Sequence, residues 1–256
     1  AKCLAETDKA TKITLVTGSW QQHYFKTAFS LNSSKIEVLD IKIKNSSISR
    51  NLWFLFGLPQ LVQKLQPDLV HLSFPLPFLR SFFPCPVVTT IHDLYPFQFP
   101  ENFGYKQVIF NRLFLKLNIY GSDALTCVSK TTLNDLKDFY PEVVSKNKKT
   151  VVIYNFVEFL NGEFERPKAF RDTLNTHFIL SVAQHRKNKN LDLLIQAYSL
   201  LIHEQPINTR RKLIIIGSQG PETENLENLI QSLSLTDSVF MLSGISDNEL
   251  CWLYQN

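Results

Sequence analysis

A short basic loop is the stretch of this chain whose residue types are best suited to chemistry. Arg186, Lys187 and Lys189 follow an apolar run at residues 178–182 and precede a segment with helical spacing. The apolar run is typical of a buried parallel strand, and a turn from such a strand into a helix presents unpaired backbone N–H groups at the positive end of the helix. Three cations at this turn predict a phosphate-binding site, and the alternative is a solvated basic turn.

The segment after this loop has the spacing of a helix. Apolar residues from Leu191 to Tyr198 recur on one helical face. Asn188 or Asn190 is available to cap the first turn.

The second candidate is His92, with Asp93 beside it, directly after an apolar run at residues 87–91. In a parallel sheet, ligands bind beyond the carboxyl ends of the strands, where these two residues would lie. An imidazole there would donate a hydrogen bond to a ligand hydroxyl or help to stabilise charge during a reaction. A capped loop histidine is the alternative, and position alone leaves both open.

The basic loop and the segment around His92 both match motifs of a known family, which is stronger evidence than their charge alone. Residues 181–198 resemble the nucleotide-sugar site of retaining glycosyltransferases with the GT-B fold, the group-one family of glycogen-synthase-like enzymes and mannosyltransferases. The family pattern contains Lys-Gly/Asn and then Leu-Ile-x-Ala, and this chain has Lys-Asn at residues 189–190 and Leu-Ile-Gln-Ala at residues 194–197. Residues 90–101 resemble the family block Thr-x-His-Asp-Leu-x-Pro…Pro-Glu, which implies a catalytic role for His92.

Weaker matches to the same family follow one another along the chain from residue 12 to residue 256. Each would be unspecific alone, but together they keep the family's order. They lie at residues 123–129 (Asp-Ala-Leu-Thr-Cys-Val-Ser), 152–155 (Val-Ile-Tyr-Asn), 214–221 (Ile-Ile-Ile-Gly-Ser-Gln-Gly-Pro) and 239–254.

The resemblance assigns the sugar donor to the second half of the chain. Ala183 and Gln184 stand where the family has Gly-Arg, so the contact of that arginine with the donor diphosphate falls to Arg186 or Lys187. The donor-binding residues that the resemblance implies are Gln184, Arg186, Lys187, Lys189, Gly217, Gly244 and Ile245.

The resemblance assigns the acceptor, a saccharide or a lipid-linked sugar, to the first half. Gly18 would let the acceptor loop approach the donor closely, although a glycine there also suits a simple turn. In the family the departing phosphate assists attack on the same face of the sugar, so no metal ion is expected, and a UDP- or GDP-sugar is a substrate rather than a cofactor. The acceptor-binding residues implied are Gly18, Ser19, Asp93, Ser129 and Asn155.

Alternating apolar runs and helical segments predict the elements that position these residues. This alternation indicates parallel, doubly wound sheets and hence an α/β chain of two Rossmann-like domains. The second domain is incomplete, with three strands where such a domain needs five or six. The predicted parts are a leader or tag-like segment at 1–11, an N-terminal acceptor-binding domain at 12–160, a linker at 161–176 and a nucleotide-sugar-binding domain at 177–256.

Each element is predicted from a short stretch of the sequence. The strands are expected at residues 12–17, 36–41, 69–72, 87–91, 124–128, 150–154, 178–182, 212–216 and 239–241. The helices are expected at 19–30, 52–66, 103–120, about 131–139, after Lys189, at about 223–233 and at 247–254.

The composition is that of an ordinary globular protein, with 44% apolar and 20% charged residues in 256. A net charge of +4 is too small to indicate nucleic acid and suits anionic small molecules or an acidic membrane face. The four cysteines are scattered, which predicts reduced thiols and a cytoplasmic location. No apolar run reaches the ~20 residues of a membrane helix, and residues 1–12 lack the apolar core of a signal peptide.

Two aromatic clusters raise the question of peripheral contact with the inner membrane face. Residues 50–56 and 80–83 each combine an arginine with several aromatic side chains, which would suit a bilayer surface. Packing into the core is the interpretation that apolar clusters favour in general.

Several other chemistries lack their motifs. The eight glycines form no G-x-G-x-x-G and no phosphate loop of the P-loop type, and G-x-S-x-G and H-E-x-x-H are absent.

The family's pair of glutamates, eight positions apart, is also missing, because it would follow residue 256. An inactive or regulatory half that only binds nucleotide, completed by about a hundred further residues or a second chain, is therefore the alternative, and a sugar-nucleotide epimerase fits the motifs poorly.

Overall fold

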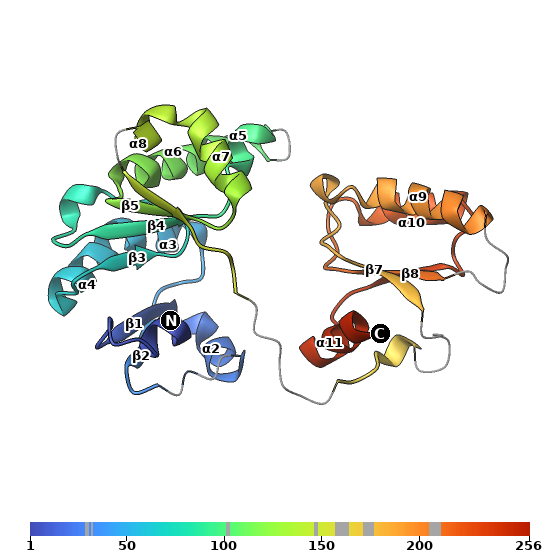
Figure 1. Cartoon of the computed structure of the whole chain (residues 1–256), viewed down its shortest axis with the longest axis horizontal. Coiled ribbons are helices and arrows are strands. Elements are labelled where there is room, and N and C mark those ends of the chain that lie inside the picture. Colours follow the sequence, from blue (N-terminus) through green and yellow to red (C-terminus); the bar gives the residue numbers. More distant parts are fainter. Residues whose placement is uncertain are drawn as a thin grey trace. The chain divides into compact units, whose positions relative to one another are not determined.

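The structure is a computed structural model that describes residues 1–28, 31, 33–100, 103–145, 148–156, 164–170, 177–204 and 211–256. The chain forms two compact units, residues 1–155 and 156–256 (Figure 1). The expected boundary at residues 160 and 161, and most of the expected linker at 161–176, lie outside the described residues. The described part of that linker includes a short 3₁₀ turn at Lys168–Phe170, and Phe170 is fully buried.

The first unit contains two parallel sheets. The strands β1 and β2 pair with each other, while the other four form a sheet in the order β3-β4-β5-β6. The strands are β1 (Ile13–Gly18), β2 (Ile36–Ile41), β3 (Val70–Leu72), β4 (Val87–Ile91), β5 (Ala124–Cys127) and β6 (Lys149–Val152).

The helices of the first unit include three that the apolar spacing did not predict: α1, which lies in the expected leader, α5 and α8. The predicted helix at 52–66 is longer, because α3 continues through a π-helical segment at Trp53–Gly57 into α4. The predicted helix at 19–30 begins as a 3₁₀ turn at Ser19–Gln21, and its last two residues lie outside the described ones. The helices are α1 (Lys2–Ala5), α2 (Gln22–Ala28), α3 (Ser47–Leu52), α4 (Leu58–Leu65), α5 (Tyr95–Gln98), α6 (Tyr105–Gly121), α7 (Lys130–Phe139) and α8 (Pro141–Ser145).

The parallel strands confirm the predicted fold class, but the expectation of one continuous sheet in this unit is wrong for the described residues. Where the structure describes the first unit, no ladder joins β1 or β2 to the four-stranded sheet. A cross-strand hydrogen bond from Thr17 Oγ1 to Asp40 Oδ1, at 2.7 Å, helps to hold β1 against β2. Hydrophobic periodicity identifies a strand but does not state which strand lies beside it, so the separation was not predictable.

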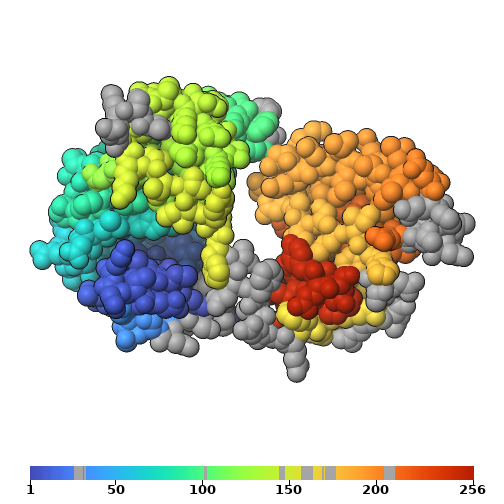
Figure 2. All heavy atoms as spheres, viewed as in Figure 1, coloured from blue at the N-terminus to red at the C-terminus, as the bar shows by residue number. Residues whose placement is uncertain are grey.

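Helices α5 to α8 cover one face of the four-stranded sheet (Figures 1 and 2). Ile91 and Leu125 of the sheet pack there against Leu115 and Leu136 of the helices, all of them buried. The same layer holds a buried polar cluster in which Thr89 Oγ1 lies 2.6 Å from Ser122 Oγ and 3.3 Å from the amide oxygen of Asn118. The Asn118 amide donates in turn to the carbonyls of Leu76 and Phe114, at 2.6 and 2.7 Å, so these buried polar groups find partners.

The aromatic residues at 50–56 and 80–83 divide between core and surface. Trp53 and Phe54 pack against a buried cluster that contains Phe83. Leu52 and Phe56, by contrast, are exposed. The interpretation as core packing is therefore correct for Trp53, Phe54 and Phe83, and wrong for Leu52 and Phe56.

The second unit is one three-stranded parallel sheet covered on both faces, as a doubly wound fold requires. Along β8, Leu213 and Ile215 pack against α9 and α10, while Ile214 and Ile216 pack against α11 and Phe170 on the other face (Figure 1). Its elements are β7 (Phe178–Val182), α9 (Leu191–His203), β8 (Lys212–Ile216), α10 (Thr223–Ser232), β9 (Val239–Leu242) and α11 (Asp247–Gln255), with the strands in the order β7-β8-β9.

Two general properties agree with the composition. Among the described residues, no helix combines the length and the apolar character needed to cross a bilayer. All four cysteines are free thiols; Cys3 is exposed, Cys85 and Cys127 are buried, and burial raises the pKa of Cys127 to about 11.

Candidate functional site

Three strands of the first unit end at one edge of the sheet and bring candidate residues together. His92 follows β4, Ser129 follows β5 two residues on, and Asn155 follows β6. His92 Nε2 lies 2.8 Å from the carbonyl oxygen of Ser73, the residue after β3. Since a carbonyl only accepts, Nε2 carries the proton, and in the neutral ring Nδ1 is left as an acceptor at this edge. A neutral His92 therefore accepts from a ligand hydroxyl here, whereas the sequence predicted that it would donate to one.

Asp93 and Ser129 each accept a backbone hydrogen bond at the start of a helix beside this edge. Asp93 Oδ1 accepts a hydrogen bond from the backbone N–H of Tyr95 at 3.1 Å, which starts α5. Ser129 caps α7 by accepting from the N–H of Thr132 at 3.0 Å. The hydroxyl of Thr132 donates to the carbonyl of His92, also at 3.0 Å, so the cap of α7 fixes the backbone beside His92.

Gly18 and Ser19 lie at the end of β1, in the two-stranded sheet, and so do not share this edge. Gly18 has an extended backbone, φ −77° and ψ 145°, that any residue adopts. A β-carbon there would lie 2.3 Å from the indole of Trp20, so packing of Trp20 explains the glycine.

The predicted donor residues follow the three strands of the second unit. Gln184, Arg186, Lys187 and Lys189 follow β7, and all four are exposed. Gly217 follows β8, and Gly244 and Ile245 come two and three residues after β9. Parallel strands place these loops at one edge of the sheet, as the sequence predicted.

The turn into α9 differs from the predicted cap. Residues Lys187–Lys189 form a 3₁₀ turn, and Asn190 occupies the N-cap position with a left-handed backbone, φ 48° and ψ 39°. Its side chain makes no capping hydrogen bond, so the predicted capping by an asparagine side chain is wrong. Side-chain capping needs an extended backbone, whereas the backbone of Asn190 is left-handed, a conformation that asparagine tolerates better than most residues.

The loops after β7 and β8 are in direct backbone contact. A β-carbon on Gly217 would lie 1.9 Å from the carbonyl oxygen of Ala183, and one on Gly220 would lie 2.5 Å from that of His185. Backbone hydrogen bonds run from Ala183 N to Ile216 O at 2.8 Å and from His185 N to Ser218 O at 3.2 Å. Two glycines therefore let the second loop support the basic one. Gly244, with φ +70°, faces open space.

His185 joins the same two loops through its side chain, which sequence analysis did not predict. It is only 3% exposed, and its Nδ1 lies 2.9 Å from Thr223 Oγ1. Thr223 Oγ1 also accepts from the N–H of Gly220 at 2.9 Å. The histidine stands inside the basic loop and is flanked by Gln184 and Arg186, but its partner is 38 residues away, so local sequence gives no sign of the contact.

The charges of the basic loop are free to meet an anion. In the part of the chain that the structure describes, Arg186, Lys187 and Lys189 form no ion pair with a carboxylate. They stand at the amino end of α9, where the helix dipole adds about half a positive charge. Cationic side chains and unpaired backbone N–H groups together favour a phosphate or diphosphate.

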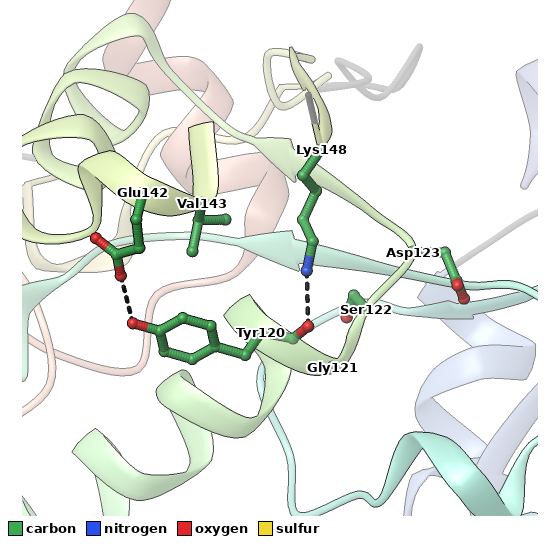
Figure 3. Close-up of a pocket in the computed structure, with 7 residues that line it drawn as sticks. All are labelled: Tyr120, Gly121, Ser122, Asp123, Glu142, Val143 and Lys148. Atoms are coloured by element: carbon green, nitrogen blue, oxygen red, sulfur yellow. Dashed lines mark hydrogen bonds between the residues drawn. The ribbon is translucent and has the colours of Figure 1, made fainter. Parts of the chain in front are cut away.

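A cavity of about 370 Å³ in the first unit lies elsewhere, at the opposite end of the strands (Figure 3). Its polar groups are already engaged: Lys148 Nζ donates to the carbonyls of Ile119 and Tyr120, at 2.6 and 2.9 Å, and the Tyr120 hydroxyl donates to Glu142. Burial lowers the pKa of Lys148, and the hydrogen bond to Glu142 raises the pKa of Tyr120. These contacts close the carboxyl end of α6, so the cavity has a structural explanation.

No group of three or more His, Cys, Asp or Glu side chains within the described ranges is arranged to hold a metal ion.

Comparison with known proteins identifies the family. Residues 9–159 match Glycosyltransferase Family 4, and residues 163–256 match Glycosyl transferases group 1. The O-antigen chain mannosyltransferase RfbU of Salmonella typhimurium is 26% identical over 179 residues, which cover 70% of this chain and 44% of that protein. The chain spans less than half the length of the curated relatives that it matches.

Solved structures share the fold at low identity. Sucrose-phosphate synthase from Thermosynechococcus elongatus superposes with a TM-score of 0.63 at 14% identity, covering 95% of this chain and 73% of that one. Anabaena Alr3699/HepE, solved in complex with UDP and glucose, gives 0.54 at 16% identity, covering 93% and 71%. Since the first family match alone spans more than half of the sequence, the chain belongs to Glycosyltransferase Family 4, in the group-1 glycosyltransferases with the GT-B fold.

Proposed function

We propose that this chain transfers a hexose from a UDP- or GDP-sugar to a saccharide or lipid-linked acceptor, with retention of the anomeric configuration. The observation that carries the proposal is a set of three cationic side chains at the amino end of α9, Arg186, Lys187 and Lys189, which form no ion pair with any carboxylate of the described residues. Membership of a glycosyltransferase family gives this anion site its most direct use, the diphosphate of a sugar donor.

In this mechanism the basic loop stabilises the leaving group. As the glycosidic bond to phosphate breaks, negative charge grows on the diphosphate oxygens, and fixed cations and helix N–H groups lower the energy of that state. The bracing of the loop by His185 and Gly217 keeps the cations in place, so little reorganisation is needed during the reaction. Gln184, Gly244 and Ile245 are assigned to the remainder of the donor by their position at the same sheet edge.

His92 is the proposed catalytic residue of the first unit. Its Nδ1 is left as an acceptor beyond β4, where it would orient a sugar hydroxyl, while Nε2 is held by Ser73. Asp93, Ser129 and Asn155 share that edge and are assigned to the acceptor, and Gly18 and Ser19 are assigned to it on the family resemblance alone. The mechanism uses no metal ion. The reaction is placed in the cytoplasm, with peripheral contact to the inner membrane face.

The names of similar proteins bear on the substrates. RfbU is named as a mannosyltransferase of the O-antigen chain, and HepE was solved with UDP and glucose. These names support a hexose donor and an acceptor in polysaccharide synthesis.

The test separates binding from transfer. Isothermal titration of UDP and of GDP into the purified chain is expected to give saturable binding of one nucleotide, and the corresponding hexose donor is expected to be turned over in a transfer or hydrolysis assay. Absence of binding for both nucleotides would refute the donor site. Binding without any turnover would favour the alternative, a chain that binds nucleotide and acts with a partner.

A further inference from the structure

The loop after β3 carries an aromatic side chain at the sheet edge where His92 lies. Phe74 is 48% exposed and follows the end of β3, at Leu72, by two residues. The residue between them is Ser73, whose carbonyl oxygen binds His92 Nε2 at 2.8 Å. The amide of Phe74 belongs to that same peptide group, and His92 is exposed as well, so the two side chains are neighbours at the surface.

The backbone of this loop is fixed on both sides of Phe74. On one side the Ser73 carbonyl is held by His92. On the other side Pro75 restricts Phe74 to an extended backbone. Leu76 is buried, and its carbonyl accepts from the buried amide of Asn118 at 2.6 Å. An exposed ring on a fixed loop loses little conformational freedom when a ligand binds to it.

The ring of Phe74 is also held by other aromatic side chains. It lies 6.1 Å from the ring of Phe54 at an interplanar angle of 84°, and Phe54 in turn lies 5.5 Å from Trp53 at 67°. Trp53 opens the π-helical segment that ends at Gly57, where a β-carbon would lie 2.5 Å from the indole. Such segments occur often at functional sites. The core therefore orients Phe74 by an edge-to-face contact and leaves about half of this residue open to solvent.

An aromatic ring beside hydrogen-bonding groups suits a pyranose. The faces of a pyranose carry C–H groups, which the negative face of an aromatic ring attracts, and its hydroxyls lie around the rim. His92 Nδ1 is an acceptor for one such hydroxyl. Asp93 is exposed too, and its carboxylate accepts at both oxygens, of which Oδ1 binds the N–H of Tyr95. A hydrocarbon chain lying on Phe74 would cover these polar groups without offering them partners, which is unfavourable.

We propose that Phe74 is the stacking platform for a sugar ring of the acceptor, one hydroxyl of which donates to His92 Nδ1. This inference rests on the proposed transfer function, because that function is the reason for a sugar hydroxyl to lie at His92. It adds the substrate class, an acceptor that presents a pyranose ring to this edge of the sheet. It also makes Phe74 a specificity residue, because an axial hydroxyl on the stacked face would hold the sugar away from the ring.

Saturation-transfer NMR with the methyl glycosides of mannose, glucose and galactose tests this subsite, in the presence of UDP and of GDP. At least one glycoside is expected to bind the parent chain, with the strongest saturation on the C–H protons of one ring face. Phe74→Leu keeps an apolar side chain but loses the flat ring, and is expected to weaken sugar binding about three- to tenfold. Phe74→Tyr keeps the ring and is expected to bind within about twofold of the parent.

Phe82→Leu is the matched control for these variants. Phe82 is 39% exposed and precedes β4, so it lies towards the opposite end of that strand from His92. The control is expected to bind the glycosides as the parent chain does. The midpoint of urea unfolding checks that each variant stays folded.

The possible results separate the subsite from the transfer function. Equal sugar binding by the parent and Phe74→Leu would overturn the subsite, and so would absence of binding for all three glycosides. Binding of farnesyl phosphate in their place, weakened by Phe74→Leu, would also overturn it, since a hydrocarbon chain would then occupy the ring. Sugar binding that depends on Phe74, in a chain that binds neither UDP nor GDP, would support the subsite and refute the transfer function alone.

Discussion

Gly217 lies so close to neighbouring backbone that there is no space for a β-carbon at this position. A β-carbon would lie 1.9 Å from the carbonyl oxygen of Ala183, and that oxygen belongs to backbone that is tied to β8 by a hydrogen bond. Gly217→Ala must push the two loops apart, which we expect to cost roughly 1–3 kcal/mol of unfolding free energy. Urea denaturation measures it. Gly104→Ala is the control, because nothing lies within 4 Å of a β-carbon there; equal stability of both variants would contradict the close approach.

Lys189 provides the sharpest test of the anion site. Removing one charge-assisted contact to a phosphate, as in Lys189→Ala, is expected to weaken nucleotide binding by about 1.5–3 kcal/mol. Titration of the nucleotide measures the change, with Lys137→Ala, an exposed lysine on α7 in the other unit, as the control. An unchanged dissociation constant would remove Lys189 from the donor site.

His92 should affect turnover rather than donor affinity. Its proposed contact is to the acceptor or to charge that develops in the reaction, so His92→Ala is expected to lower kcat much more than it raises the donor dissociation constant. Steady-state kinetics beside a nucleotide titration separates the two effects. Turnover within about twofold of the parent would leave His92 with only its structural hydrogen bond to Ser73.

At the scale of elements, one hydroxyl adds side-chain support to the basic loop, beside the backbone hydrogen bonds that join it to the loop after β8. Thr223 Oγ1 contacts both His185 Nδ1 and the N–H of Gly220, so Thr223→Val leaves two polar groups of the loop without their partner. We expect a loss of about 1–3 kcal/mol in unfolding free energy and weaker nucleotide binding, because the cations lose their fixed position. Thr223→Ser keeps the hydroxyl and should restore both quantities. If serine and valine behave alike, the hydrogen bonds contribute nothing.

The elements divide into those that the sequence predicts well and those that it does not. The strands at 87–91, 178–182 and 212–216 have the predicted bounds, because short apolar runs are sufficient evidence for strands of a parallel sheet. The expectation that the strand at 178–182 is buried is wrong, since its residues are half-buried and Val182 is exposed. Helices α5 and α8 are too short for a periodic pattern, and the separate pairing of β1 with β2 is a choice between partners that periodicity does not encode.

The candidate site shows the same division. The cations of the basic loop were predictable because charge and a strand-to-helix turn are local features. The role of His185 was not, since it arises from Thr223, the first residue of α10, whose hydroxyl lies 2.9 Å from His185 Nδ1. The left-handed backbone of Asn190 was also missed, because the same residue type suits a side-chain cap and this conformation.

At the scale of the whole molecule, the reactivities of the four thiols report how well the interior of each unit is packed. Cys3 is exposed and should react quickly with Ellman's reagent at pH 8. Cys127 is fully buried, and burial raises its pKa to about 11, so little thiolate exists and the reagent has no access. We expect fast reaction of Cys3, slower reaction of the partly exposed Cys251, and reaction of Cys85 and Cys127 only after unfolding in guanidinium. Four fast thiols in the native protein would contradict the described cores.

Because β8 is buried on both faces, unfolding of the second unit exposes a continuous apolar segment. Leu213, Ile214, Ile215 and Ile216 are buried in succession, sheltered by α9 and α10 on one side and by α11 on the other. Four consecutive branched or aliphatic side chains, released from those helices, form a segment prone to cross-β aggregation, directly preceded by three cationic gatekeepers, Arg210, Arg211 and Lys212. We therefore expect aggregation of this chain to increase with unfolding of the second unit, and a charge placed within this strand to prevent aggregation would disrupt the core that keeps the unit folded.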